Sequence, residues 1–152
     1  MLRNRAKKMT PLFIAAMLSA GLSAPDGADA RPAPVTVNEY GSLAMQNSKG
    51  ATIDEKGTGH GTFNCSVLIA LTLRGTLVSA NYTAYLQGGS ITGTAKAQIH
   101  SASTQAAFFS GTISLSRGTG SRAGASGTAS FSGTINRTSY AMTTHINGRL
   151  RL

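Results

Sequence analysis

The chain has 152 residues, with 14 Lys and Arg against 5 Asp and Glu, which gives a net charge of +9. This length allows one ordinary domain and little room for a second. The single Cys excludes an intramolecular disulfide framework and a Cys-rich zinc site. No apolar run reaches the ~18 residues that a transmembrane helix requires.

The first thirty residues have the three-part pattern of a secretory signal peptide. Four basic residues open the chain: Arg3, Arg5, Lys7 and Lys8. An apolar run follows from Pro11 to Ala24, and Ala28-Asp29-Ala30 supplies the small residues that signal peptidase accepts. We therefore predict a signal peptide over residues 1–30 and a secreted or periplasmic protein. Cleavage after Ala24 and a short cytosolic amphipathic helix are the alternatives.

Cleavage after Ala30 has a direct test. N-terminal sequencing of the exported protein should begin at Arg31, because the residues at positions 28 and 30 are both alanine. Recovery of the chain from the cytosol with Met1 intact would contradict this prediction.

Removal of the signal peptide would leave ten basic and three acidic residues, scattered from Arg31 to Arg151. A nucleic-acid interface would cluster the basic residues and interleave aromatic ones. We therefore expect no nucleic-acid partner. The charge favours solubility and a weak attraction to anionic envelope polymers or membrane surfaces.

After residue 30 the dominant signal is the alternation of apolar and polar side chains, which places one face of a strand on a core and the other in solvent. Weak strands are predicted at Val35–Tyr40 and Ala51–Glu55. Stronger runs follow at residues 63–73, 78–86, 91–99, 109–115, 131–135 and 140–152. The breaks between them are short and mostly Gly-containing, which is typical of hairpins and of antiparallel neighbours.

These strands number about eight, and each buries only one face. Closure into a barrel hides both the apolar faces and the strand edges. We predict an all-β fold, a single eight-stranded antiparallel β-barrel, with a β-sandwich as the alternative. Residues 1–30 would be the signal peptide, 31–50 an N-terminal segment with a weak strand, and 51–152 the barrel domain. Glycines within the strands supply the points at which the backbone bends: Gly93, Gly111, Gly133 and Gly148.

The loop Gly-Thr-Gly-x-x-x-Gly-Ala-x-Gly at residues 118–127, with the closing Ile146-Asn-Gly-Arg-Leu, carries a resemblance. It resembles the C-terminal hairpin of bacterial allene-oxide-cyclase-like barrel proteins and is similar to the plant dirigent proteins. The resemblance is best over Gly57–Leu152 and implies an eight-stranded barrel with a largely apolar interior. It indicates a fold rather than a reaction. Arg122 stands where the family often has an aromatic residue.

Most motifs for catalysis or metal binding are missing. His60, His100 and His145 are far apart, and the alternation places His100 and His145 on the outer face, so we expect no metal site and no cofactor. Asp54 and Glu55 point to opposite faces and cannot form the carboxylate pair of a glycosidase. The Gly-x-Ser-x-Gly motif of many hydrolases is absent.

The candidate site consists of side chains that share the inward parity. Glu55, Tyr82 and Tyr140 are the catalytic candidates. A second set comprises the candidates for ligand binding: Cys65, Tyr82, Ala97, Phe109, Phe131, Tyr140 and Thr144. In the simpler interpretation Cys65 is a small buried hydrophobe and the tyrosines reach the barrel mouth with wet hydroxyls. In the sharper one Glu55 holds or moves charge beside an apolar ligand, and the resemblance likewise implies a carboxylate and a cysteine inside the barrel.

Three functions are compatible with this pattern. We predict a secreted barrel that binds a small apolar molecule, which requires a cavity with a few polar groups. A cyclase or isomerase of the allene-oxide-cyclase or dirigent type would also need a positioned carboxylate or phenol. A structural cell-envelope or matrix protein would need only the stable shell. The sequence predicts neither the identity of a ligand nor an oligomeric state.

Overall fold

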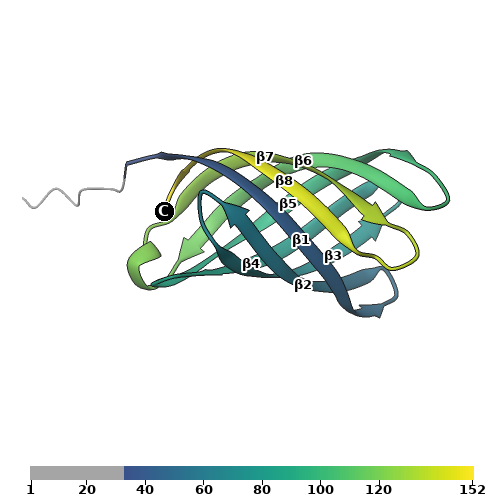
Figure 1. Ribbon diagram of the computed structural model, residues 1–152, viewed down its shortest axis with the longest axis horizontal. Helices are drawn as coiled ribbons and strands as arrows, with labels where there is room; N and C mark the ends of the chain where they lie inside the picture. The colour runs from purple at the N-terminus through teal and green to yellow at the C-terminus, as the bar shows by residue number, and fades with distance from the viewer. Residues whose placement is uncertain (1–32) are drawn as a thin grey trace, which may run out of the picture. The chain divides into compact units, whose positions relative to one another are not determined.

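The structure, a computed structural model, describes residues 33–152, so the predicted signal peptide and its cleavage site lie outside the described residues. Over this range eight antiparallel strands close into one barrel (Figure 1). The strands are β1 (Val35–Lys49), β2 (Thr52–Gly61), β3 (Cys65–Arg74), β4 (Leu77–Leu86), β5 (Gly89–Ala102), β6 (Ala106–Gly118), β7 (Ser126–Asn136) and β8 (Met142–Arg151). The predicted barrel is confirmed, and the β-sandwich is excluded.

Each strand pairs with the one before it, and β8 pairs with β1 to close the barrel. This closing register runs from Val35 opposite Leu150 to Leu43 opposite Met142. Because every strand has a neighbour on both sides, the sheet has no free edge. Among the described residues, no helix is long and apolar enough to cross a membrane.

The two ends of the barrel carry different connections. At the proximal end, as we name it here, β1 begins, β8 ends, and the β2–β3, β4–β5 and β6–β7 connections lie (Figure 1). The last of these contains a 3-10 turn, η1 (Gly120–Arg122). The distal end carries the other four connections. The longest connection is the β6–β7 loop, residues 119–125, at the proximal end; the four distal connections are shorter.

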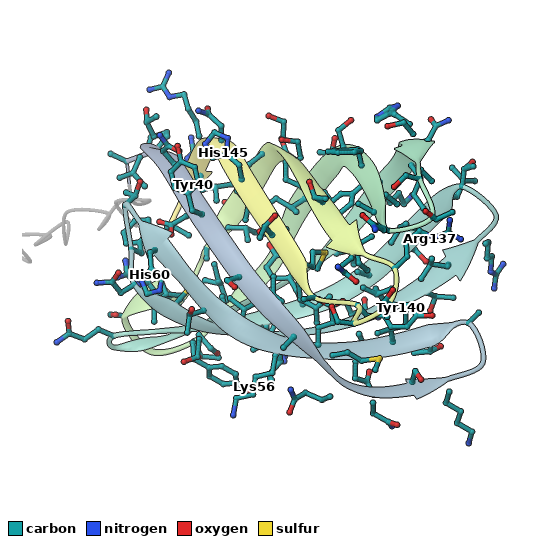
Figure 2. All side chains as sticks on the ribbon, turned by 45° about the vertical axis from the view of Figure 1, so that its right-hand side comes forward. Tyr40, Lys56, His60, Arg137, Tyr140 and His145 are labelled. Atoms are coloured by element: carbon teal, nitrogen blue, oxygen red, sulfur yellow. The ribbon has the colours of Figure 1, made fainter. Side chains whose placement is uncertain are left out.

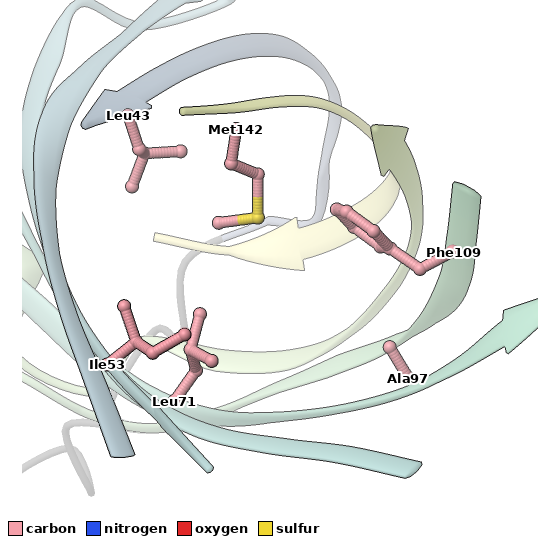
Figure 3. Close-up of a cluster of buried hydrophobic side chains, with 6 residues drawn as sticks. All are labelled: Leu43, Ile53, Leu71, Ala97, Phe109 and Met142. Atoms are coloured by element: carbon pink, nitrogen blue, oxygen red, sulfur yellow. The ribbon is translucent and has the colours of Figure 1, made fainter. Parts of the chain in front are cut away.

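The side chains alternate between interior and exterior as the sequence predicts. Six buried residues from six strands point into the interior and contact one another (Figure 3): Leu43, Ile53, Leu71, Ala97, Phe109 and Met142. Burial of these apolar groups is the main stabilising contribution to the fold.

Ile113 and Thr112 test this register. Ile113 is 8% exposed inside the barrel, whereas Thr112 lies exposed on the outer face. Ile113→Ala should lower the free energy of unfolding by roughly 2–5 kcal/mol, because it removes buried methyl groups and leaves a cavity. Thr112→Ala should cost less than about 1 kcal/mol. Denaturant unfolding measures both values, and equal losses would contradict the register.

β1 and β2 extend further than predicted. The sequence indicated Val35–Tyr40 and Ala51–Glu55, but the strands continue to Lys49 and Gly61. The inward positions of the extensions include glycines as well as Leu43 and Met45, so the alternation of apolar and polar side chains is weak there. Residues 35–49 therefore form part of the barrel wall and do not precede it. The glycines concerned are Gly41, Gly57 and Gly59.

Charged side chains are divided unevenly between the two faces of the wall. Over residues 33–152 the carboxylates of Glu39 and Glu55 are buried inside, and only Asp54 lies on the outer face. The basic residues in this range are exposed or partly exposed, and none lines the barrel cavity, although the Nε of Arg122 is buried: Lys49, Lys56, Arg74, Lys96, Arg117, Arg122, Arg137, Arg149 and Arg151. The interior thus contains acidic groups without basic ones.

Candidate functional site: the barrel interior

The barrel encloses a cavity of about 160 Å³ to which all eight strands contribute. Most of its lining is aliphatic or aromatic. The polar side chains in the lining are Glu39, Cys65, Tyr82 and Thr144. A cavity of roughly 150 Å³ with apolar walls is large enough to bind benzene. The interior therefore has room for one small ring with a few further atoms.

The structure brings most of the sequence-predicted residues together around this cavity. Six of them line it: Cys65, Tyr82, Ala97, Phe109, Phe131 and Thr144. Glu55 and Tyr140 are not among the lining residues. The strand parity thus finds most of the cavity wall.

Glu39 is a candidate side chain that the sequence reasoning missed. It lies on β1 with 8% of its surface exposed and lines the cavity. Its Oε1 accepts a 2.5 Å hydrogen bond from the backbone N–H of Phe63, whereas its Oε2 is buried without any hydrogen-bond partner. Burial raises the pKa of this carboxyl, and the Phe63 N–H and nearby His60 act against that rise. The shared parity with Val37 and Leu43 is the signal that could have identified it.

Cys65, the first residue of β3, is a neighbour of Glu39. A Cβ placed on Gly59 would lie 2.7 Å from the Cys65 Sγ and 3.7 Å from the Glu39 Oε2, so the glycine leaves room for both groups. Burial and the adjacent Glu39 raise the pKa of the Cys65 thiol. The thiol is therefore protonated at neutral pH and is a weak donor rather than a ready nucleophile.

Tyr82 crosses part of the interior from β4. Its ring packs over Gly93, where a Cβ would lie 2.6 Å from the Tyr82 hydroxyl oxygen. The hydroxyl is buried without a hydrogen-bond partner, and burial raises the pKa of Tyr82. This phenol is thus a second polar group available to a molecule in the cavity. The simpler interpretation of the sequence had expected this hydroxyl to reach water, but the Tyr82 hydroxyl is buried.

Glu55 occupies a separate place on β2. It is 1% exposed, and neither carboxylate oxygen has a hydrogen-bond partner. Its partners in register are the apolar residues Met45 and Ile69. Burial raises its pKa to about 7. Glu55 lies four residues from Gly59, roughly 13 Å along the strand, so it is not part of the Glu39 group.

Tyr140 precedes β8 instead of beginning it. It adopts a φ of 56° in the turn after β7, and its side chain packs against the buried cluster that contains Met142. A left-handed conformation is uncommon for a residue other than Gly, Asn or Asp. Tyr140 therefore lies at the distal end and does not line the cavity (Figure 2).

The proximal end is covered by contacts between two connections. The Arg122 guanidinium carbon lies 5.4 Å from the centroid of the Phe63 ring. Phe63 lines the cavity and also donates its N–H to Glu39. The loop that carries Arg122 is fixed on its other side, because Ser121 N–H donates to the Gly88 carbonyl. Phe63 and Arg122 therefore lie next to the Glu39 end of the cavity.

The histidines lie on the outer face of the barrel, where Figure 2 shows His60 and His145. The His145 ring stacks on Tyr40 at 4.5 Å and bonds to Asn38 through Nε2 at 2.6 Å. His100 bonds to Ser110. Within residues 33–152 no three His, Cys, Asp or Glu side chains are grouped so that they could hold a metal ion.

The fold and the site define an eight-stranded antiparallel barrel with an internal, mostly apolar cavity and a buried carboxylate in its wall. No protein family, curated protein or solved structure matches the chain.

Proposed function

We propose that the protein is exported and binds a small apolar molecule inside the barrel. The observation that carries this proposal is the cavity of about 160 Å³ with an almost entirely apolar lining. Concave apolar sites with a few placed polar groups are typical of small-molecule binding. Glu39, Tyr82 and Thr144 would orient the ligand, and the aliphatic wall would supply most of the binding free energy.

Ala97→Phe tests the proposal by filling the cavity. Ala97 lies on β5, is 9% exposed and lines the cavity. The chain contains no Trp, so the fluorescence of added indole can be excited selectively. Wild-type protein should shift the emission of indole to shorter wavelength, and Ala97→Phe should reduce the affinity at least about tenfold, because the phenyl group occupies the ligand's volume.

Gln98→Phe is the matched control, since Gln98 is exposed on the outer face of the same strand. It should bind indole as the wild type does. Circular dichroism should show that both variants retain the β-sheet spectrum. Binding of indole that is insensitive to Ala97→Phe would contradict the proposed cavity site.

One observation favours a second candidate, a cyclase or isomerase. The Glu39 carboxyl and the Cys65 thiol are neighbours in the cavity wall. A carboxyl group in contact with an apolar ligand could move a proton during a rearrangement. Extraction of the natural ligand after long incubation distinguishes the two functions. Unchanged ligand favours binding, whereas a product that forms with the wild type and not with Glu39→Gln favours catalysis.

A further inference from the structure

The cavity lining, as far as the structure describes the chain, contains an acidic side chain but no basic one, and this difference favours some classes of ligand over others. No Lys, Arg or His side chain from the described part of the chain lines the cavity. Among the side chains that line the cavity in that range, only that of Glu39 can carry a charge near neutral pH, since burial raises the pKa of both Cys65 and Tyr82. A bound carboxylate or phosphate would find no cation in the cavity lining and would be repelled by the glutamate.

The two oxygens of Glu39 have different environments. The Phe63 N–H donates a hydrogen bond to Oε1. Oε2 is buried and accepts no hydrogen bond. It lies beside Gly59, 3.7 Å from the position that a Cβ on that glycine would take. Two basic residues lie near this group: Arg122 sits over the ring of Phe63 with its Nε buried and without a hydrogen-bond partner, and exposed His60 acts on Glu39 through its charge. A buried acceptor without a donor costs free energy, and a ligand that supplies the donor recovers it.

We infer that the cavity selects small apolar amines, whose ammonium group pairs with the Oε2 of Glu39. This inference rests on the proposed function and names its ligand class. The fold has already removed the carboxylate from water, so the ligand does not pay for that desolvation when it binds. An ammonium group also favours the ionised form of a neighbouring carboxyl. The volume restricts the apolar part to about one six-membered ring.

Four compounds with the same ring test the inference on the wild-type protein: benzylamine, benzyl alcohol, toluene and benzoate. Competition with indole at pH 7 should rank them in that order. Benzylamine should bind roughly tenfold to a hundredfold more tightly than toluene, as expected for a hydrogen bond to a charged group. Benzoate should bind at least about tenfold more weakly than toluene.

Glu39→Gln should reduce the preference for benzylamine over toluene at least about tenfold, because the amide lacks the negative charge. Asp54→Asn is the matched control, since it removes a carboxylate from the outer face of β2 and should keep the full preference. If Glu39→Gln does not fold, the carboxyl carbon resonances of the wild type decide. Benzylamine should then shift the signal of Glu39 and leave that of Asp54 unchanged.

The outcomes separate the inference from the proposed function. If toluene binds and benzylamine or benzoate binds equally well, the inference is overturned and the apolar site stands. An amine preference that persists in Glu39→Gln, or that is lost in Asp54→Asn, also overturns it. If none of the four compounds displaces indole and indole itself does not bind, the proposed function fails.

Discussion

Gly111→Val should lower the free energy of unfolding by more than about 4 kcal/mol, or prevent folding altogether. Gly111 lies on the inward face of β6, opposite Ala97 in the β5–β6 register. A Cβ at this position would collide with the backbone carbonyl oxygen of Lys96 and would lie 2.7 Å from the Cα of Ala97. These are backbone atoms of a paired strand, so the clash is relieved only by separating β5 from β6.

Thr112→Val is the matched control for this substitution. It places the same side chain one residue away, on the exposed face of the same strand, where β-branched residues are well tolerated. Its free energy of unfolding should stay within about 1 kcal/mol of the wild type. Urea unfolding followed by circular dichroism measures both variants. A Gly111→Val protein as stable as Thr112→Val would show that the two strands do not approach so closely.

Glu55→Met should stabilise the barrel at pH 8 and weaken its dependence on pH. The pKa of Glu55 is about 7 in the folded protein against 4.5 ordinarily, because burial disfavours the charge. The folded state therefore holds this proton more tightly than the unfolded chain does. The stabilising contribution is complete below about pH 4.5 and is lost as the pH rises through 7.

This difference corresponds to at most about 3 kcal/mol, and screening by solvent reduces the expected loss to about 2 kcal/mol. The difference in stability between wild type and Glu55→Met should grow by that amount between pH 4.5 and 8. Glu39 titrates in both proteins and cancels from the comparison. Parallel profiles for wild type and Glu55→Met would show that Glu55 is not buried without a partner.

Much of the fold follows from the alternation of side chains. In β3 to β6 and in β8 the inward positions are mostly apolar, as from Ile91 to Ile99, so these strands were predicted to within about three residues of their ends. β7 was predicted too short, because it begins at Ser126 rather than Phe131 and its first inward positions are the small residues Gly127 and Ala129. β1 and β2 were underestimated because the inward positions beyond Tyr40 and Glu55 include Gly41, Gly57 and Gly59, which give no apolar signal. The length of these two strands is set by their hydrogen-bond pairing with the adjacent strands, and this pairing cannot be read from the pattern of a single segment.

The residues that line the cavity were largely predictable from the alternation, but the grouping of the polar side chains among them was not. Parity placed Cys65, Tyr82 and Thr144 inside the barrel, and they line the cavity. Parity also placed Glu55 inside, but it does not show which inward residues meet the empty space. The neighbourhood of Glu39 and Cys65 arises from the register of β1, β2 and β3 around Gly59. Register of this kind depends on the whole sheet.

The pairing of β1 with β8 joins segments about a hundred residues apart, from Leu43 with Met142 to Val35 with Leu150. The barrel cannot close until Met142–Arg151 has been synthesised, and until then the first strand and the last completed strand both remain unpaired along one edge. Contacts this distant in sequence slow folding, because the entropy cost of ordering the intervening chain arises before the favourable contacts between β1 and β8 form. A chain with this topology stays open and extended late into its synthesis, and its two unpaired edges need protection from other strands during that interval.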